Sequence, residues 1–336
     1  MAQSESAVHV FAPATIANLG AGFDVLGLAL DQPGDEIVAW RTSGRGVELE
    51  ILNDGGKLPR EPEKNTAGIA ALHVIQQLGV REGVHLRLNK GIPMVGGLGS
   101  SAGSAVAGAV AANAVFGEPL ARENLLEACV AAEGAVSGFH ADNVAAGLLG
   151  GVILVKDGGQ NVRRLPVPSK LVCALALPDV HLPTAVARKV LPNEYRLHDV
   201  VTQTGNVAML VSALYENDVR RFASAMVDVV AEPTRSRLIP GFERAQRAAL
   251  DNGALAFIIS GAGPSVCAMC DSSRVARRVV NAMQAAFIAA GVACDTLLAR
   301  PSDRGARVVY LNEAASARRK PSRSALATPP PPEHIT

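Results

Sequence analysis

The stretch with the clearest chemical potential is a loop rich in glycine and serine at residues 93–104, Pro-Met-Val-Gly-Gly-Leu-Gly-Ser-Ser-Ala-Gly-Ser. Gly96, Gly97 and Gly99 allow a tight turn and let a ligand approach the main chain. A run of Ala, Val and Gly follows, which indicates the start of a helix. Because the unpaired N–H groups and positive dipole of a helix start attract anions, the loop predicts phosphate binding.

Two common phosphate loops fit this stretch less well. A Walker-type loop needs Lys directly after its last Gly, whereas Gly99 is followed by two serines. Gly97-x-Gly99-x-x-Ala102 fits the permissive dinucleotide fingerprint, but residues 84–88 alternate polar and apolar side chains instead of forming the continuous apolar strand that this fingerprint follows. A nicotinamide site is therefore the less favoured alternative. An ordinary glycine-rich turn without a ligand is the other interpretation of this stretch.

Other polar residues suit a small polar ligand and a cation. Asn18 and Asp24 lie in a glycine-rich segment, where they either bind a ligand or serve as a turn cap and an Arg partner. Asn65 either caps a helix or contacts a nucleotide base. Glu133 lies near the negative end of a predicted helix, so it is either solvated or compensated by a cation. In a phosphate site that cation would be Mg²⁺, held by Glu133 and a loop hydroxyl.

Two arginine sites indicate a ligand that carries a carboxylate. Thr184 and Arg188 are four residues apart on one face of a predicted helix, and Arg235 opens a later helix. The planar guanidinium makes paired bonds to a carboxylate. The pattern predicts an anionic or zwitterionic substrate, with surface ion pairs as the alternative.

Composition limits the possible classes of protein. A chain of 336 residues with a net charge of +1 suits two domains and gives no reason to expect a nucleic acid or a membrane as partner. Its apolar run at residues 105–115 is shorter than the ~20 residues that span a bilayer, and the N-terminus lacks the features of a signal peptide. Five scattered cysteines are typical of reduced thiols, so we expect a cytoplasmic protein. Cys267 and Cys270 lie in a predicted strand, which would send them to opposite faces, so we do not expect a redox or metal site that uses both.

Local patterns predict the elements that position these residues. Strands are expected at residues 8–13, 35–40, 46–52 and 84–88. The second and third of these should pair antiparallel around a turn at Gly44 and Gly46. Helices are expected at residues 67–78, where Gly79 stops the helix, and from residue 122 to 135.

After Pro166 and Pro168 a second domain is expected. Within it, residues 256–266 predict a strand, a glycine turn and a return strand, and the turn should lie against a ligand or against the first loop. A helix over residues 274–290 and a strand over 307–311 follow. From residue 314 the chain is rich in proline and poor in apolar residues, which predicts disorder.

Several motifs together resemble the GHMP small-molecule kinases. Residues 93–102 are similar to the phosphate motif of that family, and Ile259-Ser-Gly-Ala-Gly-Pro264 is similar to its third motif. The segments 17–27, 140–144 and 232–241 resemble the homoserine kinase branch. The resemblance implies an α+β, two-domain GHMP kinase fold. Residues 1–165 would form a ribosomal-S5-domain-2-like ATP-binding domain, residues 166–312 a ferredoxin-like α/β-sandwich domain completing the substrate site, and residues 313–336 a disordered tail.

The same resemblance implies an ATP:L-homoserine O-phosphotransferase that makes O-phospho-L-homoserine for threonine biosynthesis, with ATP and Mg²⁺ as cofactors and a homodimer as its assembly. Another kinase of this family, acting on mevalonate, shikimate or a sugar, is the alternative, as is a non-catalytic ATP-binding module. The resemblance also implies a mechanism that relies on positioning and has no catalytic base, and we interpret Asp142, the only nearby candidate, as structural.

The resemblance also implies a role for individual residues. Nucleotide binding would involve Asn65, Pro93, Met94, Val95, Gly96, Gly97, Leu98, Gly99, Ser100, Ser101, Ala102, Gly103 and Ser104. The amino acid would be bound by Asn18, Asp24, His140, Asn143, Thr184, Arg188 and Arg235. Asp24 would meet the ammonium group, and the two arginines would meet the carboxylate. Glu133 and Ser101 would hold Mg²⁺ and, with Asn143, form the catalytic set.

Overall fold

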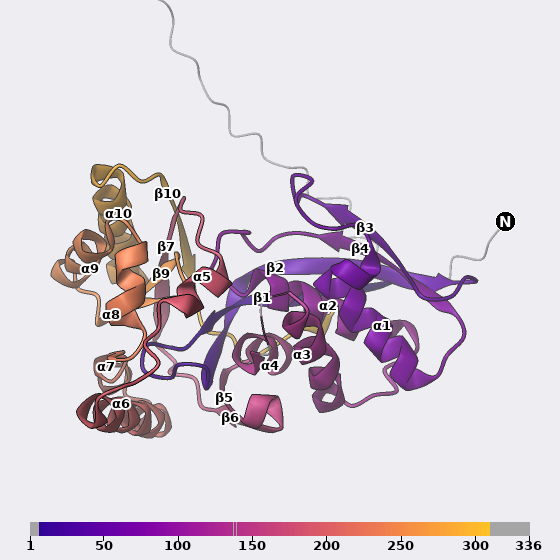
Figure 1. The fold of residues 1–336 in the computed structure, drawn as a ribbon, viewed down its shortest axis with the longest axis horizontal. Helices are drawn as coiled ribbons and strands as arrows, with labels where there is room; N and C mark the ends of the chain where they lie inside the picture. The colour runs from indigo at the N-terminus through magenta and orange to yellow at the C-terminus, as the bar shows by residue number, and fades with distance from the viewer. Residues whose placement is uncertain (1–6, 137, 139, 310–336) are drawn as a thin grey trace, which may run out of the picture.

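Two β-sheets, each covered by helices, make up the fold (Figure 1). The computed structural model describes residues 7–136, 138 and 140–309. The predicted disorder of the tail at residues 313–336 therefore lies outside the described residues, as does the end of the strand expected at 307–311. Helices and strands from both halves of the sequence meet near the middle of the molecule.

The larger sheet contains seven strands among the described residues, in the order β11-β1-β2-β4-β3, with β5 paired to β2 and β6 to β5. Its strands are β1 (Val8–Ala17), β2 (Leu26–Thr42), β3 (Val47–Leu52), β4 (Gly83–Asn89), β5 (Val152–Lys156), β6 (Asn161–Leu165) and β11 (Arg307–Val308). β1 and β2 are longer than expected. The glycine-rich segment near the N-terminus is therefore a short loop, residues 18–25, in which Asn18 and Asp24 have left-handed backbone angles.

The predicted pairing of residues 35–40 with 46–52 is wrong. β4 lies between these strands, antiparallel to β2 and parallel to β3. The physical reason is burial: Val84, Leu86 and Leu88 of β4 are all fully buried under the helices, which suits an inner strand. β3 carries Glu48 and Glu50, charged side chains that suit an edge.

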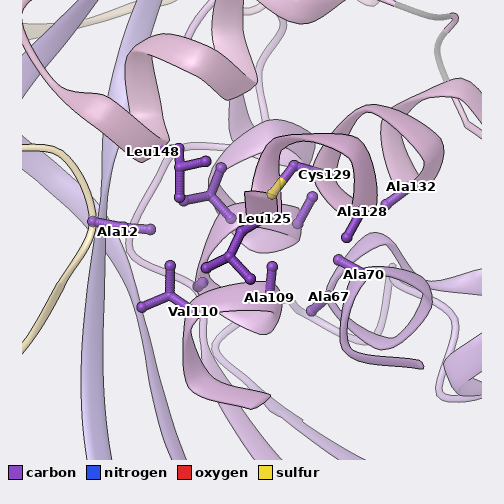
Figure 2. Close-up of a cluster of buried hydrophobic side chains, with 14 of the residues drawn as sticks. Ala12, Ala67, Ala70, Ala109, Val110, Leu125, Ala128, Cys129, Ala132 and Leu148 are labelled. Carbon is purple, nitrogen blue, oxygen red and sulfur yellow. The ribbon is translucent and has the colours of Figure 1, made fainter. Parts of the chain in front are cut away.

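Helices cover one face of the larger sheet (Figure 1). They are α1 (Thr66–Leu78), α2 (Ser100–Val115), α3 (Leu126–Gly134) and α4 (Ala141–Leu149), with 3-10 turns η1 (Pro62–Lys64), η2 (Arg122–Leu125) and η3 (Asp157–Gly159). The expected helix stop at Gly79 is confirmed, because Gly79 is left-handed and ends α1. The small residues of α2 let other helices approach closely: a Cβ at Gly108 would lie 2.2 Å from the Ala67 carbonyl oxygen. Figure 2 shows the resulting cluster of alanines.

The smaller sheet has the strand order β10-β7-β9-β8, with every neighbouring pair antiparallel. Its strands are β7 (Val172–Pro178), β8 (Ala256–Ile259), β9 (Val266–Cys270) and β10 (Cys294–Ala299). The helices of this half are α5 (Thr184–Lys189), α6 (Leu197–Glu216), α7 (Val219–Ser224), α8 (Glu232–Arg235), α9 (Phe242–Asp251) and α10 (Ser273–Ala289), with the 3-10 turn η4 (Ser236–Leu238). This order of strands is the ferredoxin-like one that we expected.

The two faces of the smaller sheet bury different partners. One face packs on α9 and α10. The other packs on α6, α7 and the adjoining ends of β1 and β2, so one apolar core joins the two sheets. Cys270 belongs to the first core and Cys267 to the second, which confirms that these cysteines point to opposite faces. Burial raises the pKa of both thiols, that of Cys270 to about 12. Of the helices that the structure describes, none could span a membrane.

A buried ion pair fixes the glycine loop to the larger sheet. Lys90, at the end of β4, donates to the Asp35 carboxylate of β2 at 2.5 Å, and the two side chains are 3% and 0% exposed. The Lys90 ammonium also donates to the Ser100 carbonyl and the Ser104 hydroxyl of α2, at 3.1 and 2.9 Å. The second Asp35 oxygen accepts the N–H groups of Gly91 and Ile92. This network therefore joins the strand before the loop to the helix after it.

We expect Lys90→Met to lower the free energy of unfolding by about 4 kcal/mol, because the substitution leaves the Asp35 carboxylate buried without its cation. Urea unfolding measures the change. Arg220→Met is the matched control: it removes an exposed ion pair with Asp271 and should cost less than about 1 kcal/mol. Equal losses in the two variants would contradict a structural role for the buried pair.

Candidate active site

A cavity of about 350 Å³ lies where the two halves of the molecule meet. It is lined by the glycine loop, the 18–25 loop, the end of α3 and the start of α4. Residues of α5, α8 and the β8–β9 turn complete the lining. Most of the predicted site residues line it, namely Asn18, Asp24, Asn65, Met94, Val95, Gly96, Gly97, Gly99, Ser100, Ser101, Ser104, Glu133, His140, Asn143, Thr184, Arg188 and Arg235.

Four residues of the predicted nucleotide loop do not line the cavity: Pro93, Leu98, Ala102 and Gly103. Leu98 and Ala102 point into apolar cores, and a Cβ at Gly103 would collide with Ile92. The Leu98 carbonyl also accepts the Thr15 N–H, at 3.1 Å. These residues therefore shape the loop from behind.

The backbone of the loop needs glycine at two positions. Gly97 has φ of +105° and Gly99 has φ of +64°, both in the left-handed region. A Cβ at Gly99 would lie 2.1 Å from the Thr15 hydroxyl, and one at Gly97 would lie 2.6 Å from the Ser260 carbonyl oxygen. Gly99 is the N-cap of α2, so the first N–H groups of that helix lie at the cavity. This is the anion-binding arrangement that the sequence predicts.

The β8–β9 turn is bound to the glycine loop. The Ser260 hydroxyl donates to the Gly97 carbonyl at 2.5 Å, and the Ser265 N–H donates to the Gly96 carbonyl at 3.3 Å. The Asn18 amide donates to the Gly261 carbonyl at 2.8 Å. We expected this turn to lie against a ligand or against the glycine loop. Its contact with the glycine loop is confirmed, and the turn also lines the cavity.

Two oxygen ligands come together beside the start of α2. The Ser101 hydroxyl donates to Glu133 Oε1 at 2.8 Å, and Glu133, on the last turn of α3, is only 6% exposed. Hydroxyl and carboxylate oxygens suit Mg²⁺, which usually binds few protein ligands and completes its shell with water and substrate phosphate. The described part of the chain contains no cluster of three His, Cys, Asp or Glu side chains that could hold a metal alone. The donor set therefore fits a cation that is shared with a phosphate.

Asp24 and Arg188 form a paired salt bridge in the cavity, with N–O distances of 3.0 and 2.9 Å. His140 Nδ1 lies 3.2 Å from an Arg188 nitrogen and 3.8 Å from Asp24 Oδ1. Burial lowers the pKa of His140, and the charge of Arg188 lowers it further. The Asp24–Arg pair that the sequence offered as an alternative to ligand binding is thus present, and it lies inside the cavity.

Arg235 is 3% exposed and is held by the main chain. Its Nε donates to the Ala187 carbonyl at 3.0 Å, and Nη1 donates to the Gly261 carbonyl at 3.3 Å. The guanidinium carbons of Arg235 and Arg188 lie 4.9 and 5.5 Å from the centre of the Phe23 ring. One aromatic ring therefore contacts both arginines.

The start of α4 carries Asp142 and Asn143. The Thr15 hydroxyl donates to Asn143 Oδ1 at 2.7 Å, and Asp142 Oδ1 accepts the N–H of Asn143 at 2.8 Å. Burial raises the pKa of Asp142 to about 7, and the charges of Asp24 and Glu133 add to the effect, while Arg188 opposes it. Asp142 is thus a buried carboxyl whose oxygen is engaged at the helix start, in keeping with a structural role.

Sequence reasoning missed several residues that organise this site. Thr15, Asp35 and Lys90 are single residues without a motif, and their partners are distant in sequence. Phe23 lies within the motif at residues 17–27, but its contacts with Arg188 and Arg235 were not predicted. Asn65 was expected to cap a helix or to contact a base: its side chain caps α1 at the Ala67 N–H and its residue also lines the cavity.

Comparisons with known proteins agree with this geometry. Residues 65–151 match the family GHMP kinases N terminal domain, and residues 210–289 match GHMP kinases C terminal. A homoserine kinase of Chlorobium phaeovibrioides is 40% identical over 84% of this chain and 92% of its own length. One from Xylella fastidiosa is 38% identical over 90% of this chain and 94% of its own.

Solved structures give the same result for the fold. The crystal structure of a homoserine kinase from Cytophaga hutchinsonii matches with a TM-score of 0.86 and 39% identity, covering 92% of this chain and 99% of that one. The L. major mevalonate kinase matches with a TM-score of 0.66 over 87% of this chain and 95% of that one. Its identity is only 16%, so it supports the fold alone.

The pKa of Asp142 predicts a pH dependence of stability in the ligand-free protein. Because this pKa is about 7 in the folded chain and 3.8 ordinarily, the folded state binds the proton more tightly. That contribution is present at low pH and is lost as the pH rises through about 7. We expect Asp142→Asn, which stays neutral, to be more stable than the parent protein at pH 8 and to have a smaller advantage at pH 5. Urea unfolding at both pH values measures this.

Asp251→Asn, at an exposed position on α9, is the control and should change stability similarly at both pH values. An advantage of Asp142→Asn that is absent, or equal at the two pH values, would contradict the burial of a titrating carboxyl.

Proposed function

This chain belongs to the homoserine kinase family of the GHMP kinases, and from that membership we propose that its cavity transfers the γ-phosphoryl group of ATP to the hydroxyl of L-homoserine. The product is O-phospho-L-homoserine, an intermediate of threonine biosynthesis. One observation carries the proposal: the glycine loop at the start of α2 and the group of Asp24, Arg188 and Arg235 line the same cavity. An anion site thus lies beside charges of both signs.

The nucleotide is proposed to bind on the glycine-loop side. The N–H groups at the start of α2 would bind its phosphates, since that helix end carries the positive dipole. Residues 93–104 supply the loop, and Asn65 lies near the adenosine. Lys64 and Thr66 also line this side of the cavity, which adds a cation and a hydroxyl to the donors available there.

Glu133 and Ser101 are proposed to hold Mg²⁺. The ion supplies neutralisation of the charge that develops on the phosphate oxygens. The chain contributes the position of both ligands: Ser101 belongs to the first turn of α2 and Glu133 to the last turn of α3, and their side chains are already in contact. Neither ligand needs a long movement to face a shared ion.

The amino acid is proposed to bind on the other side, at Asn18, Asp24, His140, Asn143, Thr184, Arg188 and Arg235. Homoserine carries an ammonium and a carboxylate, and the Asp24–Arg188 pair offers the opposite charge to each. A bound zwitterion can therefore replace the Asp24–Arg188 ion pair with two others, in which its ammonium meets Asp24 and its carboxylate meets Arg188. Arg235, held by two main-chain carbonyls, would meet the substrate carboxylate in a fixed orientation.

Phosphoryl transfer then depends on alignment. Its transition state is loose, so holding the hydroxyl in line with the γ-phosphate and neutralising charge matter more than a strong base. Asn143, fixed by Thr15, is proposed to orient the reacting groups. Asp142 lies next to it, but its carboxylate accepts the Asn143 N–H, and we assign it a structural role.

We propose that the chain is divided into two domains that correspond to the nucleotide side and the amino-acid side of the cavity. Residues 1–165 would form the ATP-binding domain and residues 166–312 the domain that completes the substrate site, except that β11 returns to pair with β1 of the larger sheet. The assembly is proposed to be a homodimer located in the cytoplasm. All five cysteines are free and buried, which fits a reducing compartment. The exposed apolar side chains of α6, among them Val201 and Met209, fit a surface that a second subunit covers.

A coupled ADP-release assay with homoserine, mevalonate, shikimate and galactose tests the substrate. We expect turnover with homoserine and little with the other three, because only homoserine satisfies both charges of the Asp24–Arg188 pair. Preferential turnover of mevalonate or shikimate would favour another kinase of the family, and ATP binding without any turnover would favour a non-catalytic module.

We expect Arg235→Leu to raise the homoserine KM by about a hundredfold, because a buried charge-assisted contact with the carboxylate is lost. The ATP KM should change little, since Arg235 lies on the amino-acid side. Steady-state kinetics measures both constants. Arg237→Leu, an exposed arginine two residues along, is the matched control and should leave both constants near their parent values. A rise in the ATP KM alone would contradict the assignment.

A further inference from the structure

Two loops carry Asp24 and Arg235, two of the charged side chains of the amino-acid side. One is residues 18–25, with Asn18, Phe23 and Asp24. The other is residues 226–235, which ends in α8 with Arg235. The loops touch at Gly20, where a Cβ would lie 2.0 Å from the Met226 carbonyl oxygen. Their spacing matters, because Phe23 of the first loop lies 4.9 Å from the Arg235 guanidinium carbon of the second.

Gln203 of α6 binds both loops with one side-chain amide. Its Nε2 donates to the Ala21 carbonyl at 2.7 Å and to Asp228 Oδ1 at 3.1 Å. Its Oε1 accepts the Val229 N–H at 3.0 Å. Both ends of the amide are thus used, and they reach atoms of one segment 182 residues before Gln203 and of another 25 residues after it.

Asp228 extends this connection to Arg235. Its Oδ1 accepts the N–H groups of Val230 and Ala231 at 2.8 and 3.0 Å, and its Oδ2 accepts that of Glu232 at 3.0 Å. Glu232 is the first residue of α8, and Arg235 is its last. A continuous set of hydrogen bonds therefore runs from Gln203 through Asp228 to the start of the helix that carries Arg235.

Apolar packing fixes only part of this spacing: Leu19 and Met226, one from each loop, are buried in the core that joins the two sheets. The buried residues of α6 are Leu210, Ala213 and Leu214, all in its C-terminal half. The half that contains Gln203 borders an open apolar hollow of about 470 Å³, whose walls include Phe23, Val207 and Val230. Because side chains do not fill this hollow, hydrogen bonds link α6 to the loops there: Gln203 reaches both loops, and Asn206 donates to the Val227 carbonyl at 2.8 Å.

We propose that Gln203 is a positioning residue for the amino-acid substrate, an inference that rests on the proposed function. It holds the 18–25 loop and the 226–235 loop at the separation that places Phe23, Asp24 and Arg235 around one ligand. It does not itself line the substrate cavity. Its loss should therefore weaken homoserine binding and leave nucleotide binding unchanged.

The test compares Gln203→Ala and Gln203→Glu with Ser212→Ala in the full chain, by steady-state kinetics with homoserine and ATP and by thermal unfolding. Ser212 lies on α6 and its hydroxyl donates to Glu216 of the same helix at 3.0 Å, so it controls for the stability of α6. We expect Gln203→Ala to raise the homoserine KM about tenfold and the ATP KM less than about twofold.

Gln203→Glu separates the two ends of the amide. It keeps an oxygen for the Val229 N–H but places a carboxylate against the Ala21 carbonyl and Asp228, so it should raise the homoserine KM at least as much as alanine does. Gln203→Met, which keeps the length of the side chain without its polar atoms, replaces the alanine variant if that variant unfolds.

Equal changes in the two KM values, or homoserine KM values within about twofold of the parent in every Gln203 variant, would overturn the positioning role. A parent protein that does not phosphorylate homoserine would overturn the proposed function together with this inference. A parent that does so, with unaffected variants, would overturn the inference alone.

Discussion

The buried charge pair between Lys90 and Asp35 is the constraint on which the rest of the site depends. Taking two charges out of water is costly unless each is paired and hydrogen-bonded, and here the ammonium has three acceptors and the carboxylate has additional N–H donors. These partners come from β2, from the loop and from α2. The pair can be satisfied only when strand, loop and helix are together, so the main-chain donors of the loop are oriented before any ligand arrives.

The same principle of arranged polar contacts extends to the other half of the molecule. Ser260 and Ser265 bind the glycine loop from the β8–β9 turn, and Asn18 binds that turn from the first half. Each half of the molecule therefore donates hydrogen bonds to the other at the cavity. The polar groups of the cavity are mixed in sign, with the N–H groups at the start of α2 on one side and the Asp24–Arg188 pair on the other, which suits two ligands of different charge held side by side.

Local features of the fold were predictable from the sequence, and long-range ones were not. The helix that ends at Gly79, the helix start after the glycine loop, and the opposite faces of Cys267 and Cys270 follow from nearby residues. The insertion of β4 between β2 and β3 depends on burial that is known only once the helices are in place. The family motifs located most of the cavity residues, whereas Lys90 and Gln203 act through partners far away in sequence, which no local pattern reveals.

The final strand has a consequence for how the two halves can move. β11 pairs with β1, and the Ala306 N–H donates to the Gly147 carbonyl at 2.7 Å, so the chain returns to the larger sheet after completing the smaller one. Two covalent crossings, one after β6 and one after β10, therefore link the halves. These crossings and the apolar core that joins the two sheets both oppose separation of the halves. Cutting either crossing alone would therefore leave the two halves covalently joined.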